Sequence, residues 1–460
     1  MAPVMPGTAY SSATARSSGL TTPRGAALTI GAVLGTGVIS LPSLAADLAG
    51  PASIVAWVAL VLLSIPLAAT FAALGARHPD SGGVSTYVRR AFSGRAASAV
   101  GWCFYFAIPV GAPPAAAFAG GYVADLLGGG RTTMLLTAAA LVAVVAAMNA
   151  FGLRISGTAQ LVLAAVLGVL LVAATVTALP HADLDNLAPF APKGWAAVGG
   201  TAAVLVWAFA GWEAVTSLSA DYRNPRRDIP RVTVIAVVVV GVLYLGVVVT
   251  SFLVLGPRTG RSQAPLADLL AIGFGPPARV VTTVVALLLI VGAMNAYFAG
   301  GSRLGAALGR DGALPAWFAR GGSAGEVPRR SLAVIALLSL TSLAVTAFAR
   351  VELTASVLLA TGSFTMVYVL GTAAAIKLLP RHSWAWRGAV VSFTSVMALL
   401  VLTGPHVLWA VGVMVTAVLY ESWSSRRTSR ATSRIPSSTD SDGTAPYPTT
   451  NPACVGRSPQ

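Results

Sequence analysis

A single carboxylic acid lies deep in an apolar stretch of this sequence. Glu213 falls within VLVWAFAGWEAVTSLSA, well inside an apolar run, whereas Asp125 lies only at the end of another run. Placing a carboxyl group in the hydrocarbon of a bilayer costs about 3 kcal/mol, so such a group faces a protein interior or is protonated. Glu213 is therefore a candidate for binding a substrate or a proton. The alternative is that it hydrogen-bonds to nearby backbone groups and supports their geometry.

Glycine residues interrupt two apolar runs at comparable depth. The first run contains GAVLGTGVISLP, which includes Gly35, Thr36 and Gly37, and the sixth run contains AFAGWE around Gly211. Because each interior glycine costs a helix about 1 kcal/mol relative to alanine, we predict that both helices break here. The alternative is close helix packing through small residues, since Gly31 and Gly35 have the required spacing.

The two predicted breaks would present opposite backbone charges. N–H groups freed at residues 35–37 suit a carboxylate, and carbonyl groups freed at residues 207–210 suit an ammonium group. Two breaks five runs apart are typical of a secondary transporter whose two inverted repeats bind a substrate near the bilayer midplane. No lysine, arginine or aspartate lies beside the breaks within the runs, so we expect a zwitterion with a neutral side chain.

Twelve runs of the sequence are long and apolar enough to be transmembrane helices. A helix needs about 20 mostly apolar residues to cross ~30 Å of hydrocarbon. The runs are continuous, whereas the strands of a membrane barrel alternate apolar and polar residues, so a helical bundle is predicted. The twelve runs lie at 25–46, 53–75, 97–124, 133–151, 158–179, 196–219, 232–256, 277–302, 331–349, 352–376, 387–403 and 405–421.

The composition excludes a water-soluble fold. Hydrophobic residues make up 56% of the 460 residues, charged residues make up 10%, and the mean hydropathy is +0.78. Soluble domains are about 25% charged. Cys103 and Cys454 cannot form a disulfide framework, and the four histidines show no metal-ligand spacing. No phosphate-binding loop or catalytic grouping of Ser, His and Asp occurs, so we expect neither an enzyme nor a bound metal or cofactor.

The basic residues gather on one side of the predicted membrane map. In a soluble protein, the formal net charge of +15 would suggest nucleic-acid binding. On the map of twelve runs, 24 of the 30 Lys and Arg residues fall on the side that holds the N-terminus. Because cytoplasmic loops carry the excess of Lys and Arg, both termini are predicted to be cytoplasmic. Nucleic acid is therefore not an expected partner.

Three segments are expected along the chain. Residues 1–24 form an N-terminal cytoplasmic tail that lacks the apolar core of a cleavable signal. Residues 25–421 form the transmembrane domain. This domain divides into two repeats and two extra helices, at about 25–179, 196–376 and 387–421. Residues 422–460 are rich in Ser, Thr, Arg and Pro and are predicted to be a disordered cytoplasmic tail.

Five motifs, in order, resemble the amino acid, polyamine and organocation superfamily of transporters. They are GTG at 35–37, PDSGGVSTY at 79–87, WAFAGWE at 207–213, NPRRDIPR at 224–231 and SRLGAALGRDGALPAWFA at 302–319. Within this superfamily, GWCFYFAIPVGAPPA at 101–115 is most similar to bacterial exporters of methionine and branched-chain amino acids. The resemblance implies an all-α polytopic membrane fold, with ten helices in two inverted repeats plus two extra helices.

The resemblance also implies how backbone groups at the breaks would bind a substrate. The amides that would bind its carboxylate are those of Gly35, Thr36 and Gly37. The carbonyl groups that would bind its ammonium group are those of Val33, Trp207 and Ala210.

The resemblance also suggests roles for several side chains near the breaks. Phe209 would act as a gating ring, and Tyr297, beside Asn295, falls where relatives place an aromatic ring against the substrate. Some proton-coupled relatives carry a lysine in the fifth span, but residues 158–179 contain none. Glu213 is then the titratable residue available for proton coupling or for support of the site. Without the resemblance, each aromatic side chain is more typical of core packing or lipid contact than of ligand binding.

The sequence therefore predicts a secondary active transporter in a bacterial cytoplasmic membrane. Its expected substrates are neutral apolar amino acids (methionine, leucine, isoleucine and valine), exported in exchange for protons by alternating access. An importer or exchanger of the same fold is the first alternative, because direction depends on coupling. A polytopic membrane enzyme or a channel is a remote alternative, since neither a catalytic cluster nor a polar pore ring is evident. The oligomeric state is left open.

Overall fold

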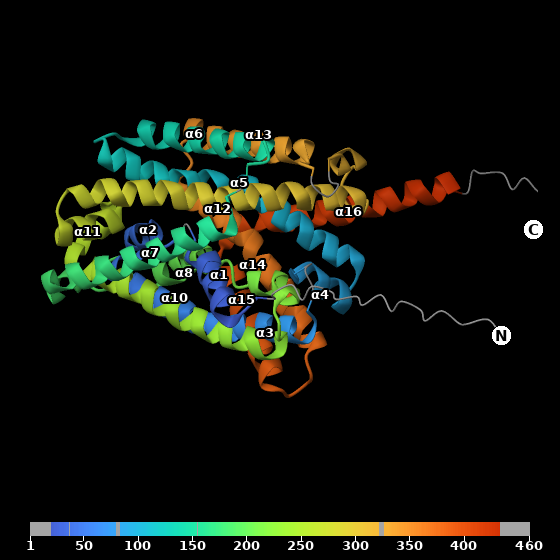
Figure 1. Cartoon of the computed structure of the whole chain (residues 1–460), viewed down its shortest axis with the longest axis horizontal. Helices are drawn as coiled ribbons and strands as arrows, with labels where there is room; N and C mark the ends of the chain where they lie inside the picture. The colour runs from blue at the N-terminus through green and yellow to red at the C-terminus, as the bar shows by residue number, and fades with distance from the viewer. Residues whose placement is uncertain (1–19, 36, 80–82, 154, 322–325, 433–460) are drawn as a thin grey trace, which may run out of the picture. The chain divides into compact units, whose positions relative to one another are not determined.

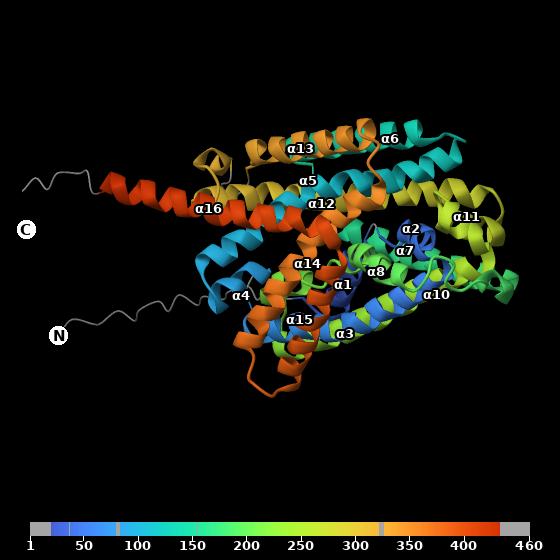
Figure 2. The same cartoon turned by 180° about the vertical axis from the view of Figure 1, so that it is seen from behind.

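The computed structural model of the chain is almost entirely helical (Figure 1, Figure 2). It describes residues 20–35, 37–79, 83–153, 155–321 and 326–432, and within them no β-strand forms. Ten helical segments of this described part are long and apolar enough to cross a membrane. They contain α3 (Ser53–Arg77), α5 (Gly94–Leu126), α6 (Arg131–Ala150), α7 (Gly157–Ala178), α10 (Pro225–Leu255), α12 (Pro277–Arg310), α13 (Arg329–Phe348), α14 (Leu353–Leu378), α15 (Trp384–Leu402) and α16 (Val407–Thr432). Each matches one of the twelve predicted runs, and the chain is an all-α polytopic membrane protein.

The two remaining runs are interrupted, as their glycines predict. α1 (Thr22–Leu34) ends at Gly35, and the chain resumes a helix at α2 (Leu41–Ala49). α8 (Ala196–Phe209) ends at Ala210, whose backbone is extended, and only the short α9 (Ala214–Ser217) follows. Gly211 has a φ of 127°, which residues with a side chain rarely adopt. The second break therefore depends on this glycine.

The order of elements in the first half of the chain recurs in the second. An interrupted helix opens each half, a long helix follows, and a short helix precedes the next long one. The short helices are α4 (Gly83–Ala91) and α11 (Pro265–Phe274). α5 and α12 have 33 and 34 residues, and α6 and α13 both have 20. This is the element order that two structural repeats of five spans produce.

Contacts between the two halves are reciprocal. α1 packs against α10 as α8 packs against α3, and α7 packs against α12 as α14 packs against α5. α3 lies beside α10, and α6 lies beside α13, in both views (Figure 1, Figure 2). Such paired contacts are those of two similar halves related by a two-fold rotation, as in transporters with inverted repeats.

The chain beyond α14 differs in one place from what the sequence predicts. α15 and α16 are the two extra helices, but α16 continues to Thr432, past Glu421, after which the sequence predicts a disordered tail. The segment SWSSRRTSRAT contains helix-favouring arginine, and no proline or glycine occurs before Pro436, which explains the longer helix. The rest of that predicted tail, 433–460, lies outside the described residues, as does most of the N-terminal tail.

An ionic cluster joins three helices at the end of the bundle where α11 lies (Figure 1). Arg279 of α12 binds two carboxylates, with Nη1 2.6 Å from Asp125 Oδ2 of α5 and Nη2 2.5 Å from Asp268 Oδ1 of α11. The Ser262 hydroxyl donates to the other oxygen of Asp268 at 2.5 Å, and Ser43 of α2 donates to the Ser262 carbonyl at 2.6 Å. The cluster therefore connects α2, α5, α11 and α12 at this end.

Replacing Arg279 by methionine is expected to lower the free energy of unfolding by about 1–3 kcal/mol, because Asp125 and Asp268 then lose their cationic partner. Thermal unfolding of the purified protein in detergent measures the loss. Adding Asp268→Asn to this variant should recover part of it, since one of the unpaired charges is removed. An unchanged melting temperature in Arg279→Met would mean that water screens these partly exposed charges and that the cluster contributes nothing.

Candidate functional site

The two interrupted helices cross with their backbones in contact. An added Cβ at Gly37 would lie 2.8 Å from Ala208 Cα, and one at Gly211 would lie 2.9 Å from the carbonyl oxygen of Ala32. Cβ atoms essentially never lie closer than 3.0 Å to a neighbouring heavy atom. Each break therefore has a glycine at the point where the backbone of the other break passes. The glycines that predict the breaks also set the distance between them.

Tyr244 of α10 connects the two breaks. Its hydroxyl lies 2.8 Å from the carbonyl oxygen of Val33 and 2.9 Å from that of Ala208. A tyrosine hydroxyl has one proton to donate, so it satisfies one of these carbonyls at a time. The ring is fully buried and packs against Trp57 and Phe209, with centroid distances of 5.5 and 5.3 Å. Tyr244 thus ties the end of α1 to the end of α8.

We expect Tyr244→Phe to lower the free energy of unfolding by about 1–3 kcal/mol, because two buried carbonyl groups lose their shared donor while the ring remains. Thermal unfolding in detergent measures the loss. Tyr122 offers a matched control, since its buried hydroxyl donates to the Ile39 carbonyl at 2.6 Å and also hydrogen-bonds the Leu266 backbone. Tyr122→Phe should therefore cost a similar amount. An unchanged melting temperature in Tyr244→Phe, beside a clear loss in Tyr122→Phe, would show that Tyr244 does not hold the two breaks together.

The carboxyl group of Glu213 binds the second break. Its Oε2 atom accepts hydrogen bonds from the Gly211 backbone N–H at 3.0 Å and from the Tyr368 hydroxyl of α14 at 2.5 Å. The same N–H lies 3.1 Å from the Tyr368 hydroxyl oxygen, so the three groups form a closed triangle. A separation of about 2.5 Å is typical of a hydroxyl that donates to a charged carboxylate. Glu213 therefore stabilises the non-helical backbone of the second break.

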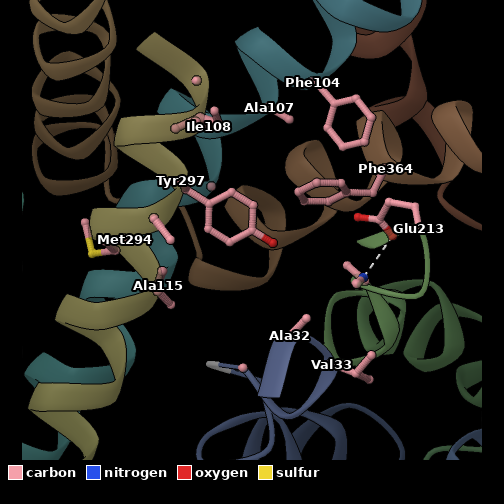
Figure 3. A pocket seen from close by; sticks show the side chains of 18 of the residues that line it. Ala32, Val33, Phe104, Ala107, Ile108, Ala115, Glu213, Met294, Tyr297 and Phe364 are labelled. Atoms are coloured by element: carbon pink, nitrogen blue, oxygen red, sulfur yellow. Dashed lines mark hydrogen bonds between the residues drawn. The ribbon is translucent and has the colours of Figure 1, made fainter. Parts of the chain in front are cut away.

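A cavity of about 570 Å³ lies at the crossing of the breaks (Figure 3). Small-molecule sites commonly measure about 300–1,000 Å³. Its walls come from α1, α5, α7, α12 and α14 and from both breaks, and most of the wall residues are apolar. The wall side chains with polar atoms are Gln160, Trp207, Glu213 and Tyr297. Figure 3 shows Glu213 and Tyr297 on opposite sides of this space. Such a site can bind a small zwitterion with a neutral side chain.

The cavity extends from the breaks toward one end of the bundle. Its wall includes Leu28 of α1, Phe104 in the first half of α5 and Leu304 near the end of α12, and these positions lie toward the end at which α1 begins. Toward the other end, the Tyr122 hydroxyl binds the Ile39 carbonyl, and α2 packs against the 3-10 helix η5 (Gly256–Arg261). The ionic cluster around Arg279 lies at this second end.

Most of the residues that the sequence predicts for the site line the cavity. They are Val33, Gly35, Gly37, Trp207, Ala210, Glu213 and Tyr297. The Val33 carbonyl, predicted to bind an ammonium group, already accepts a hydrogen bond from Tyr244, which leaves it one lone pair. Thr36 lies outside the described residues, and the roles of all these residues toward a ligand stay predictions.

Two residues predicted for the site do not line the cavity. Asn295 is buried, and its amide binds the turn before α7, donating to the Leu153 carbonyl at 3.2 Å and accepting from the Ile155 N–H at 3.2 Å. Phe209 packs against the ring of Tyr244. Wall residues flank Asn295 on both sides and one follows Phe209 directly, so only the direction of these two side chains separates them from their neighbours. The structure therefore directs both side chains away from the cavity.

Three residues of the site gave no clear signal in the sequence. Tyr244 and Tyr368 lie in apolar helices far along the chain from the break that each one binds, where a tyrosine resembles ordinary core. Gln160 stands at the start of α7, where a polar residue suggests only the boundary of a membrane span. The one usable signal was the hydroxyl of a buried tyrosine, which normally requires a hydrogen-bond partner.

Interrupted helices that cross beside a cavity, in a bundle with two reciprocal halves, define a polytopic membrane transporter for a small molecule. A family model described as amino acid permease matches residues 20–424. The chain belongs to the amino acid permease family, and the resemblance to the superfamily that contains it is confirmed. It is a multi-pass membrane transporter rather than an enzyme.

Three curated relatives illustrate the similarity. The uncharacterized amino acid permease YecA of Bacillus subtilis is 32% identical over 85% of this chain and 93% of its own length. The L-methionine/branched-chain amino acid exporter YjeH of Escherichia coli is 32% identical over 75% of this chain and 83% of its own. The branched-chain amino acid permease BcaP of Bacillus subtilis is 25% identical over 63% of this chain and 66% of its own.

Proposed function

We propose that this chain exports neutral, apolar amino acids such as methionine, leucine, isoleucine and valine. The proposal rests on the cavity at the crossing of the breaks, whose described wall residues are mostly apolar and include one carboxyl group, that of Glu213. Backbone dipoles at the breaks suit a zwitterionic main chain, and the apolar walls suit an apolar side chain. The 32% identity to an exporter of methionine and branched-chain amino acids supports the same substrates.

Transport proceeds by alternating access around this cavity. The substrate enters from the end at which α1 begins, toward which the cavity extends. Its carboxylate binds amides at the break of α1, near Gly35 and Gly37, and its ammonium group binds carbonyl groups near Trp207 and Ala210. Release at the other end requires α2 to part from η5 and the contacts around Arg279 to rearrange.

Glu213 couples transport to protons. Among the described wall residues, Glu213 is the one with a carboxyl group, and it faces the space that a substrate would occupy. Protonation of this group would weaken the hydrogen bonds that it accepts from Tyr368 and Gly211, because both bonds are stronger to a charged carboxylate. A proton taken up here would thus change the course of the second break, which is part of the binding site.

The proposed membrane is the bacterial cytoplasmic membrane, with both chain termini in the cytoplasm. The support is the distribution of basic residues, since 24 of the 30 Lys and Arg residues fall on one side of the map. The cavity then extends toward the cytoplasm, which is the side from which an exporter loads its substrate.

Purified protein in liposomes tests the proposal. Vesicles loaded with labelled methionine, leucine, isoleucine or valine should release the label faster when the outside is more acidic than the inside, and lysine and glutamate should be poor substrates. Absence of efflux and of counterflow for all four would overturn the proposal. Direction is tested in cells that carry the protein, where faster loss of labelled methionine from preloaded cells is expected. Uptake exceeding efflux would identify an importer instead.

A further inference from the structure

One face of α12 and one face of α5 line the cavity opposite each other. On α12, the wall residues Tyr297, Gly300 and Leu304 are three and four positions apart, which is the spacing of residues on one helix face. On α5, Phe104 and Ile108 recur in the same way. The two helices pack directly against each other, so residues on these faces lie across a shared space.

Two consecutive glycines of α12 have different surroundings. A Cβ at Gly301 would lie 2.3 Å from Ile108 Cδ1 and 3.0 Å from Ile335 Cδ1, so a glycine there allows α12 to pack against α5 and α13. A Cβ at Gly300 would meet no atom within 4 Å, although this residue lies inside the helix and lines the cavity. Glycine destabilises a helix relative to alanine. Helix packing therefore explains Gly301 and does not explain Gly300.

Aromatic rings bound the cavity on the side opposite α12. Phe104 and Phe364 are arranged edge to face, with their centroids 6.2 Å apart. Figure 3 shows this pair across the cavity from Tyr297. Such walls suit a flexible apolar side chain, and the sulfur of a thioether makes favourable contacts with aromatic rings.

We propose that Gly300 sets the longest side chain that a substrate of this transporter can have, by leaving room for the end of an apolar chain such as that of methionine. The inference rests on the proposed function, because it requires an amino acid in this cavity. With its main chain at the breaks, the substrate extends its side chain past Tyr297, between Gly300 and the pair of Phe104 and Phe364. A side chain added at Gly300 would occupy this space without displacing protein atoms.

Gly300→Leu tests the inference through ligand binding, which requires neither an ion gradient nor a direction of transport. Purified protein in detergent is titrated with alanine, 2-aminobutyrate, norvaline, norleucine and methionine, and the rise in melting temperature gives each apparent affinity. The wild type should bind norleucine and methionine most tightly. In Gly300→Leu, the affinities for norleucine and methionine should fall at least about tenfold relative to the affinity for 2-aminobutyrate. This is the discrimination that one or two methylene groups provide in an apolar pocket. Gly300→Ala should lower the same two affinities by a smaller factor.

A glycine of α16 provides a control. A Cβ at Gly412 also meets no atom within 4 Å, and this residue is not part of the cavity wall. Gly412→Leu should keep the order of affinities of the wild type.

The outcomes separate this inference from the proposed function. An unchanged order of affinities in Gly300→Leu, or an equal loss for all five ligands, overturns the role of Gly300 and leaves amino acid binding intact. If Gly300→Leu does not fold, the order in Gly300→Ala decides in the same way. If none of the five amino acids stabilises the wild type, the proposed function fails and this inference fails with it.

Discussion

Glu213→Gln is expected to abolish the response of transport to a pH gradient while substrate exchange continues. Glutamine keeps an oxygen that can accept from the Gly211 N–H and the Tyr368 hydroxyl, as a protonated carboxyl group does, so the variant should keep the site in the arrangement of the protonated state. Its amide does not titrate, so no proton crosses in exchange for the substrate. If one proton exchanges for one substrate, a gradient of one pH unit sustains at most about a tenfold substrate gradient. In the variant, the ratio of substrate concentrations across the membrane should fall to about one.

Two measurements in the same liposomes separate coupling from structural support. Counterflow of labelled methionine requires only an intact site, whereas accumulation under a pH gradient requires coupling as well. Glu213→Ala, which removes the acceptor for Gly211 and Tyr368, should reduce both. Accumulation by Glu213→Gln at the wild-type level would show that the carboxyl group supports the break without coupling. Loss of counterflow in Glu213→Gln, as severe as in Glu213→Ala, would indicate substrate binding by the carboxylate instead.

The breaks and the buried carboxylate could be predicted from the sequence because each has a local cause. Gly35 and Gly37 weaken a helix wherever that helix packs, and Glu213 costs free energy in hydrocarbon whatever its neighbours are. The apolar runs depend on local composition in the same way. None of these predictions requires knowledge of which helices pack together, and the structure has both breaks where the glycines indicate them.

The direction of individual side chains could not be predicted in this way. Trp207, near the end of α8, and Ala210, directly after it, line the cavity, while Phe209 between them turns toward Tyr244. An amphipathic pattern would fix the rotation of a helix about its axis, but α8 is apolar on all sides and has no such pattern. Contacts from distant helices set that rotation instead. The sequence of α8 therefore does not indicate that Phe209 points away from the cavity, and the roles predicted for Phe209 and Asn295 toward a substrate stay predictions.

The hydrogen-bond partners of the breaks also come from distant parts of the sequence. Tyr244 lies 211 positions from Val33, whose carbonyl it binds, and Tyr368 lies 155 positions from Glu213. Only the packing of α10 against α1 and of α14 against α8 brings these groups together. The sequence therefore predicts that the breaks exist, whereas the tertiary structure determines what holds them.

Gly211→Ala is expected to destabilise the fold and to stop transport, because the new side chain meets two obstacles at once. A residue with a Cβ rarely adopts the φ of 127° found here, and the strain costs about 1–3 kcal/mol. The added Cβ would also lie 2.9 Å from the carbonyl oxygen of Ala32, which belongs to a backbone that cannot rotate away. Overpacking of this kind costs about 1–3 kcal/mol more. Any backbone shift that relieves this contact also moves the Gly211 N–H, which donates to the Glu213 carboxyl group.

Gly200, in the helix α8 that precedes this break, provides the matched control. A Cβ there meets no atom within 4 Å, so Gly200→Ala should leave the free energy of unfolding unchanged or raise it by up to about 1 kcal/mol. Thermal unfolding compares the stabilities of the two variants. Counterflow of labelled methionine, measured on the same preparations, shows whether the binding site is intact. Equal melting temperatures would contradict both the strained φ and the backbone contact between α1 and the second break. Because both variants add one methyl group, a loss confined to Gly211→Ala traces to these two local causes.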